Sequence, residues 1–161
     1  MDKRTSKHNY YLDIADSVLE RSTCMRRKYG AIIVRNDEII STGYNGAPRG
    51  RRNCTDLGVC ARETLNIPSG QRYELCRSVH AEANAIISAS RRDMIGSTLY
   101  LVGRDAKTNE LIPAVSCTMC KRHIINAGIE TVVSRINESE YSVLDVNEWI
   151  VNDDSLFIPE E

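Results

Sequence analysis

The apolar residues of the chain fall into short stretches whose spacing changes between that of helices and that of strands. Residues 6–22 are predicted to form an amphipathic helix, because their apolar positions recur at steps of three and four. Apolar runs at 30–34 and 38–44 predict two strands, and the short polar segment between them predicts an antiparallel hairpin. The apolar positions of the first helix are Tyr11, Ile14, Ala15, Val18 and Leu19.

The second half of the chain predicts a further alternation of helices and strands. We expect an alanine-rich helix at 79–87, a buried strand at 98–102, a helix at 117–127 that ends at Gly128, a strand at 131–133 and a last helix at 142–151. This order predicts an α/β fold in three layers, α/β/α, with a central mixed sheet of about five strands and helices on both faces.

The segment from about 45 to 76 interrupts this pattern with Gly, Pro, Arg and Cys residues. An irregular stretch of about 30 residues is unusual inside a compact domain, and it usually has a function or an internal staple. The sequence shows no repeat and no shift in composition that would mark a domain boundary. We therefore expect residues 1–161 to form a single domain with an irregular, cysteine-containing insert at about 45–76.

Composition and charge are those of an ordinary globular protein. Hydrophobic residues make up 42% of the 161 positions and charged residues 27%, with a formal net charge of −1. This balance gives no reason to expect nucleic acid or a membrane as a partner. The chain has no apolar run of the roughly 20 residues that a transmembrane helix needs, and its N-terminal segment lacks the apolar stretch of a signal peptide. We expect a cytoplasmic protein.

The six cysteines point to metal chemistry, because thiols in a reducing compartment more often bind metals or act in catalysis than form disulfides. Cys117 and Cys120 are three apart at the predicted start of a helix, which places both sulfurs on one side of its first turn. His80 can supply a third zinc ligand, which leaves the fourth position for water, and Glu82 can carry a proton of that water. Taken alone, the cysteine pair also fits half of a structural zinc site or a redox pair.

The combination of His80 and Glu82 with Cys117 and Cys120 resembles the motif of zinc-dependent nucleobase deaminases. Four stretches also resemble the deoxycytidylate (dCMP) deaminase family in the right order, namely 21–31, 41–48, 76–82 and 124–129. The resemblance implies a cytidine-deaminase-like fold with a catalytic zinc on His80, Cys117 and Cys120. It also implies that the chain hydrolyses dCMP to dUMP and ammonia, in pyrimidine deoxynucleotide metabolism, with Glu82 as the proton carrier.

One position departs from the family pattern. Ser116 stands directly before the first cysteine of the pair, where the family usually has proline, and the nearest proline is Pro113. Proline in that place fixes the backbone approach to the helix, so its replacement changes what can be expected of the 113–116 loop. In the family, the backbone of this loop contacts the amino group that leaves. The resemblance assigns substrate contacts to Ser116 in this loop and, separately, to Ala81.

The resemblance also implies where a nucleotide binds. Asn45 matches the position whose side-chain amide holds the sugar, although its segment is equally good turn-forming sequence. The adjacent Arg26, Arg27 and Lys28 supply charge for a monophosphate, and we expect one or two of them to contact it. Tyr141 resembles a phosphate-contacting tyrosine of the family.

Regulation and assembly are implied by the resemblance alone. Many family members are activated by dCTP, which can carry Mg²⁺, and inhibited by dTTP, at a site near the loop that follows the second strand. Here that region contains Gly43, Gly46, Arg49 and Arg51, and its arginines equally fit a solvated charge run. The family is usually hexameric, so we expect a homohexamer.

Four cysteines are not needed by the catalytic site. Cys24, Cys54, Cys60 and Cys76 lie in or near the irregular insert, and four thiolates satisfy a closed structural zinc site that would hold such a segment in place. Some dCMP deaminases bind a second zinc there, partly through positions that resemble Cys24 and Cys54. The alternative is four ordinary buried or free thiols.

Two other functions fit parts of the sequence. A deaminase of cytidine, guanine or adenosine in transfer RNA shares the zinc motif, but an RNA substrate calls for a basic face, and a free nucleoside does not need the Arg-Arg-Lys cluster. A non-catalytic, zinc-stapled interaction module does not need Glu82, because a structural site has no open position. Ammonia release from dCMP, cytidine and dCTP, by the wild type and Glu82→Gln, distinguishes these functions.

Overall fold

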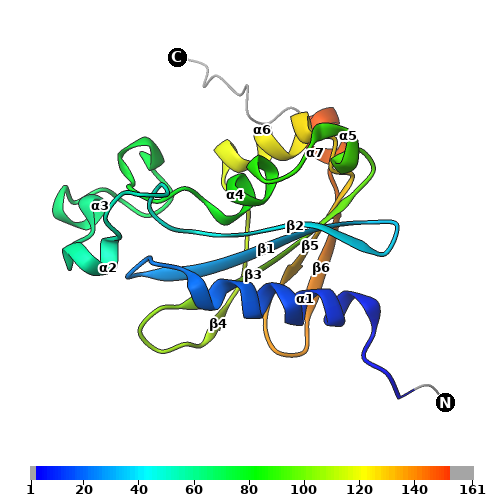
Figure 1. Cartoon of the computed structure of the whole chain (residues 1–161), viewed down its shortest axis with the longest axis horizontal. Helices are drawn as coiled ribbons and strands as arrows, with labels where there is room; N and C mark the ends of the chain where they lie inside the picture. The colour runs from blue at the N-terminus through cyan, green and yellow to red at the C-terminus, as the bar shows by residue number, and fades with distance from the viewer. Residues whose placement is uncertain (1–2, 153–161) are drawn as a thin grey trace.

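The structure of residues 3–152, a computed structural model, is a mixed β-sheet between two layers of helices (Figure 1). The strands are β1 (Arg27–Arg35), β2 (Glu38–Tyr44), β3 (Thr98–Asp105), β4 (Leu111–Ile112), β5 (Thr131–Arg135) and β6 (Tyr141–Asp145). The helices are α1 (Lys7–Val18), η1 (Leu19–Arg21), α2 (Cys54–Leu57), α3 (Ala61–Thr64), η2 (Tyr73–Leu75), α4 (Ala81–Ile87), α5 (Arg91–Met94), α6 (Thr118–Ala127) and α7 (Asn147–Asn152), of which η1 and η2 are 3₁₀ helices. Helix α1 covers one face of the sheet, and α4 to α7 cover the other.

The sheet has the strand order β2-β1-β3-β5-β6, and β4 pairs with the end of β3. Neighbouring strands are antiparallel except for β3 and β5, which are parallel and are connected through α6. Parallel neighbours need such a crossover, because the chain must return to the same end of the sheet. The β1–β2 hairpin turns at Asn36 and Asp37, whose φ values of 51° and 60° are those of a tight two-residue turn.

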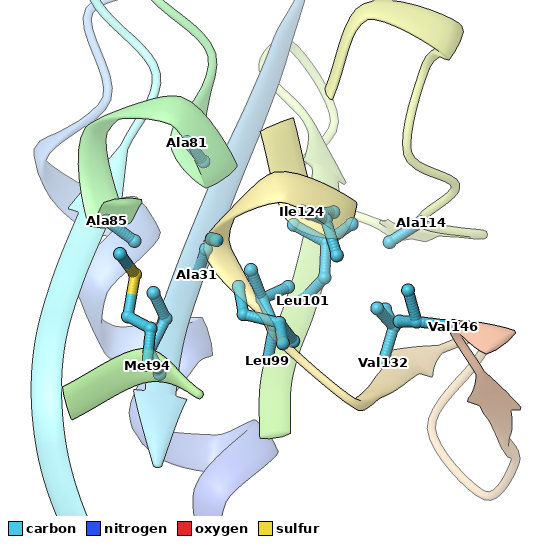
Figure 2. Packing of buried hydrophobic residues seen from close by; sticks show 13 residues of the cluster. Ala31, Ala81, Ala85, Met94, Leu99, Leu101, Ala114, Ile124, Val132 and Val146 are labelled. Atoms are coloured by element: carbon cyan, nitrogen blue, oxygen red, sulfur yellow. The ribbon is translucent and has the colours of Figure 1, made fainter. Parts of the chain in front are cut away.

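Strand alternation divides the core into two clusters. In β1, Ile33 faces the layer of α4 and α6, whereas its neighbour Ile32 faces α1. The first cluster packs Leu101 of β3 against Ile124 of α6 and includes Ala85 of α4 (Figure 2). Because β1 and β3 are buried on both faces, the middle of the sheet is a fixed platform for α4 and α6.

Two arginines on the sheet hold α1 over its face. Arg104 of β3 donates from Nε and Nη2 to the two carboxylate oxygens of Asp16, at 2.6 and 2.9 Å. Arg135 of β5 donates to Asp13 at 2.9 Å. Bidentate geometry makes the Arg104–Asp16 pair stronger than an ordinary surface ion pair.

The predicted fold class is confirmed, and two segments differ from their predicted structure. The predicted helix at 142–151 is wrong at its start, because residues 141–145 form β6 at the edge of the sheet. Their alternating pattern is too short to be distinguished from the helix that follows. The insert at 45–76 is not structureless, since it contains α2, α3 and η2. None of the helices within residues 3–152 is long and apolar enough to cross a membrane.

Gly43 lies where β2 passes directly under α4. A Cβ atom at this position would overlap the carbonyl oxygen of Ala81 and the amide nitrogen of Ala85, both in the helix backbone. Gly43→Ala should therefore lower the free energy of unfolding by about 1–3 kcal/mol, as overpacking usually does. Denaturant unfolding measures the change, with the exposed neighbour Thr42→Ala as control. A Gly43→Ala variant as stable as Thr42→Ala would contradict this packing.

Candidate active site

The two halves of the predicted metal motif lie at the N-terminal ends of two helices in one layer. His80 directly precedes α4 and Cys117 directly precedes α6, and both residues have extended backbone, with ψ of 154° and 164°. Cys117 also caps α6, because its Sγ accepts a hydrogen bond from the Cys120 amide at 3.4 Å. Helices α4 and α6 pack against each other, which brings the two halves together.

The three predicted ligands face one another. His80 Nδ1 lies 3.5 Å from Cys117 Sγ and 3.3 Å from Cys120 Sγ. A tetrahedral zinc ion with Zn–S of about 2.3 Å and Zn–N of about 2.0 Å holds such N and S atoms roughly 3.5 Å apart, so the three residues fit zinc. Among the described residues, no other group of three or more His, Cys, Asp or Glu side chains brings its ligand atoms within 4.8 Å of one another.

The electrostatics of the cluster also suit a cation. The Cys120 side chain, together with His80, lowers the pKa of Cys117 to about 4. Cys117 and burial raise the pKa of Cys120, and Cys117 also raises the pKa of His80. One thiolate therefore forms readily, and a divalent ion held by these residues would supply the positive charge that stabilises the second.

Glu82 lies beside these ligands with only 5% of its surface exposed. Burial raises the pKa of its carboxyl, and the nearby Ser116 side chain acts in the opposite direction. The buried Ser116 Oγ has no hydrogen bond of ordinary geometry within residues 3–152. A buried carboxylate beside metal ligands is placed to accept and return protons.

A pocket opens to Glu82 and His80. Its wall comes from β1 and the segment before it, from Asn45, from the insert and from the loop before α6. The residues that line it are Cys24, Arg26, Arg27, Tyr29, Asn45, Cys60, Arg62, Ser69, Tyr73, Cys76, Ser78, His80, Glu82, Val115 and Cys117. The predicted metal site is thus accessible to a small molecule, unlike a closed structural zinc site.

Residues 5–136 match a protein family model described as the cytidine and deoxycytidylate deaminase zinc-binding region. The chain belongs to this family. The deoxycytidylate deaminase of Mycobacterium phage D29 is 39% identical over 129 residues, which cover 77% of this chain and 90% of the relative. The deoxycytidylate deaminase of Schizosaccharomyces pombe is 34% identical over 130 residues, which cover 81% of this chain and 37% of the relative. The chain thus spans little more than a third of the yeast relative.

Solved structures of this deaminase family share the fold. The dCMP deaminase of cyanophage S-TIM5 in apo form is 26% identical, with a TM-score of 0.57 and coverage of 82% of this chain and 84% of that chain. The same phage enzyme in complex with dCMP and dUMP aligns with a TM-score of 0.53 at 24% identity, over 80% of this chain and 82% of that chain. The cytidine-deaminase-like fold that the sequence predicts is confirmed.

Asn45, the predicted sugar contact of this deaminase family member, is a rigid part of the pocket wall. Its Oδ1 accepts hydrogen bonds from the Ser22 hydroxyl at 2.6 Å and the Tyr29 amide at 2.9 Å. Its Nδ2 donates to the Arg27 carbonyl at 2.9 Å. The side chain therefore joins three segments around the pocket, whatever ligand it also contacts.

The basic cluster at the start of β1 is divided, because two of its three residues line the pocket and one does not. Arg26 and Arg27 line the pocket, whereas Lys28 does not. This division follows from strand alternation, since Arg27 and Lys28 are the first two residues of β1 and point to opposite sides. Arg26 also forms an ion pair with Glu63 of the insert, at 3.1 Å.

Three other predicted substrate contacts lie outside the pocket lining. Ala81, the first residue of α4, is buried in the core, and the Ser116 side chain is buried beside Glu82. Tyr141 begins β6 on the α1 side of the sheet, with its ring centroid 5.5 Å from that of His8. These positions give no support to a direct side-chain contact with substrate, and the three assignments remain predictions.

The four remaining cysteines gather around the insert. Cys24, Cys60 and Cys76 line the active-site pocket. Burial raises the pKa of the Cys54 thiol, and the charges of the other three thiols raise it further. The sulfurs of Cys24 and Cys76 accept backbone hydrogen bonds from Arg26 at 3.5 Å and Ser78 at 3.4 Å. The thiols are neighbours, but no three of these four sulfurs all lie within 4.8 Å of one another, as the ligand atoms of His80, Cys117 and Cys120 do.

The predicted effector residues lie at different places. Gly43 is under α4, and Gly46 forms an isolated bridge with Val79. Arg49 is exposed, and Arg51 lines a second hollow beside the insert. That hollow is lined by Pro48, Arg51, Cys54, Leu57, Val59, Ala61, Leu75 and Arg77.

The sequence did not identify Arg62, Tyr73 and Tyr29 as parts of the pocket. Arg62 and Tyr73 belong to the insert, whose sequence has no periodicity from which a side-chain direction could be read. The sequence marks these two residues only by their position between Cys60 and Cys76. Tyr29 follows the basic cluster, and strand alternation from Arg27 places it on the same side.

Proposed function

We propose that the chain is a zinc-dependent deaminase that hydrolyses dCMP to dUMP and ammonia. The observation that carries this proposal is the buried Glu82 at a pocket that also reaches His80 and Cys117. A zinc-stapled module without catalytic activity would have no use for a buried carboxylate at an open metal site. The deaminase names of the phage and yeast relatives agree with the proposal.

The residues of the site account for the proton transfers of this reaction. His80, Cys117 and Cys120 would hold a zinc ion, which would supply a nucleophile at neutral pH by lowering the pKa of a bound water to about 7. Glu82 would accept one proton of that water and pass it to ring N3, and it would then take the second proton from the oxygen added at C4 and deliver it to the departing amine. Asn45 and the insert hold the nucleotide in place.

Arg26 and Arg27 favour a monophosphate over a free nucleoside. Their guanidinium groups match the geometry of phosphate oxygens, and each hydrogen bond to a charged group is worth roughly 1.5–3 kcal/mol. We expect kcat/KM for dCMP to exceed that for cytidine by about 100-fold or more, which corresponds to two such contacts. Ammonia release from dCMP, cytidine and dCTP measures the preference. Higher activity on cytidine than on dCMP would contradict the assignment.

A second, structural zinc on Cys24, Cys54, Cys60 and Cys76 is part of the proposal. The sulfurs of Cys24 and Cys76 each accept a backbone amide hydrogen bond, as the sulfur of Cys117 does. Metal analysis of the purified protein should give two zinc ions per chain, and Cys54→Ser should reduce the content to one. A wild-type content of one zinc per chain would contradict the second site.

Assembly, regulation and location complete the proposal. A cytoplasmic homohexamer would cover exposed apolar residues such as Ile87 and Val143, which are 66% and 56% exposed.

The hollow between Arg51 and Arg77 is a candidate site for dCTP with Mg²⁺, or for dTTP. Light scattering tests the assembly, and dCMP turnover with and without each triphosphate tests the regulation. A monomeric protein would contradict the assembly. A turnover rate that neither nucleotide changes would contradict the regulation.

A further inference from the structure

The insert reaches the proposed catalytic metal site through one aromatic side chain. Tyr73, in η2, packs edge-to-face against the His80 ring, with ring centroids 4.9 Å apart and planes at 85°. His80 and the two cysteine ligands all belong to the α4 and α6 layer, whereas Tyr73 comes from the insert. The contact therefore joins the least regular part of the chain to a metal ligand.

Tyr73 is held in place by Arg62. The Arg62 guanidinium lies 4.5 Å from the centroid of the Tyr73 ring. Its Nη2 donates to the carbonyl oxygens of Pro68 and Gln71, each at 2.9 Å, and the residue is only 6% exposed. A buried cation needs compensation, and here two carbonyls and an aromatic face provide part of it, while the buried Nε has no hydrogen-bond partner within residues 3–152. Arg62 thus fixes the 68–71 turn and the Tyr73 ring together.

The His80 ring has little else to fix its orientation. Its Nδ1 faces the two cysteine sulfurs, and no hydrogen bond from within residues 3–152 reaches its other ring nitrogen. Histidine ligands are usually oriented by a hydrogen bond at the nitrogen that does not bind the metal. In this chain the Tyr73 ring packs against the His80 ring instead, and this contact restricts rotation of the imidazole.

We infer that Tyr73 is a positioning residue for the zinc ligand His80 and that Arg62 holds Tyr73 in that place. The inference rests on the proposed zinc site of His80, Cys117 and Cys120. It implies that the fold of the insert sets the affinity of the catalytic zinc, so the insert is part of the metal centre as well as a wall of the pocket.

Zinc release from the holoenzyme tests this inference without using activity. Excess 4-(2-pyridylazo)resorcinol binds the released zinc and reports the rate of release. The kinetic phase of release from the catalytic site is the one that is absent in Cys117→Ser. Tyr73→Leu should accelerate this phase about 10- to 100-fold, the range for loss of an outer-shell partner. Tyr73→Phe, which keeps the ring, should release zinc within about threefold of the wild-type rate, well below that range. Arg62→Met should also accelerate release, whereas Arg72→Met, at an exposed neighbour, should not.

The possible outcomes separate a positioning role from the alternatives. Release from Tyr73→Leu at the wild-type rate would overturn the inference, including the case in which only KM for dCMP increases. Equal acceleration in Tyr73→Phe and Tyr73→Leu would also overturn it, because the ring would then not be the cause. If the wild type releases zinc from this site but does not deaminate dCMP, the proposal that dCMP is the substrate is contradicted. The comparison between Tyr73→Phe and Tyr73→Leu still decides the role of Tyr73.

Discussion

Replacing Glu82 with glutamine should reduce turnover of dCMP by about 10²- to 10⁴-fold, the usual contribution of a general acid–base group. Glutamine has nearly the same size and shape, so it can fill the buried space of the carboxylate without disturbing α4. Its amide cannot accept a proton from water and return it to the leaving amine. KM for dCMP should change little, because Arg26, Arg27 and Asn45 are untouched.

Steady-state ammonia release, together with zinc content, measures this effect. The variant should retain the zinc of the wild type, since Glu82 is not among the three residues whose ligand atoms converge. Glu38→Gln, at an exposed position on β2, is the matched control and should be as active as the wild type. Wild-type turnover by Glu82→Gln would remove this carboxylate from the mechanism.

Cys117→Ser should abolish catalytic zinc binding while leaving helix α6 intact. The Cys117 sulfur has two functions, because it faces His80 and also accepts the hydrogen bond from the Cys120 amide. A serine hydroxyl is among the best N-caps, so it retains the second function, but it is a poor replacement for a thiolate ligand. The loss of activity should exceed the roughly 10- to 100-fold that follows removal of an outer-shell partner.

Cys117→Ala separates the two functions of this side chain. It removes the ligand and the cap, so it should be less stable than Cys117→Ser by about 0.5–2 kcal/mol, the usual cost of a lost N-cap. Denaturant unfolding in the presence of a chelator compares the two variants without a contribution from zinc. Full zinc occupancy in Cys117→Ser would show that Cys117 is not a required ligand.

The convergence of His80, Cys117 and Cys120 could be predicted from the sequence because these residues stand at or near helix starts. The three-residue spacing of Cys117 and Cys120 places both sulfurs at one end of α6, and the end of that helix is marked by Gly128, whose φ is 82°. The pattern of buried strands likewise predicted the sheet, since each of the two central strands is apolar on both faces.

The insert could not be predicted in the same way, because the positions of its side chains depend on long-range contacts. Arg62 is fixed by carbonyls at 68 and 71, and neither its direction nor that of Tyr73 follows from a period of two or 3.6 residues. The strand β6 was missed for another reason. It is stabilised by pairing with β5, and its own five residues carry only a weak strand signal.

The pairing of β1 with β3 has a consequence for the order of folding. Arg27 is opposite Asp105 in this pair, so the whole insert and α4 must be synthesised before the central strands can meet. Contacts between such distant residues form slowly because a long loop must first close. On the ribosome, His80 and Glu82 emerge before the cysteines of α6. The nascent chain therefore cannot assemble its proposed zinc site until most of the domain has been translated.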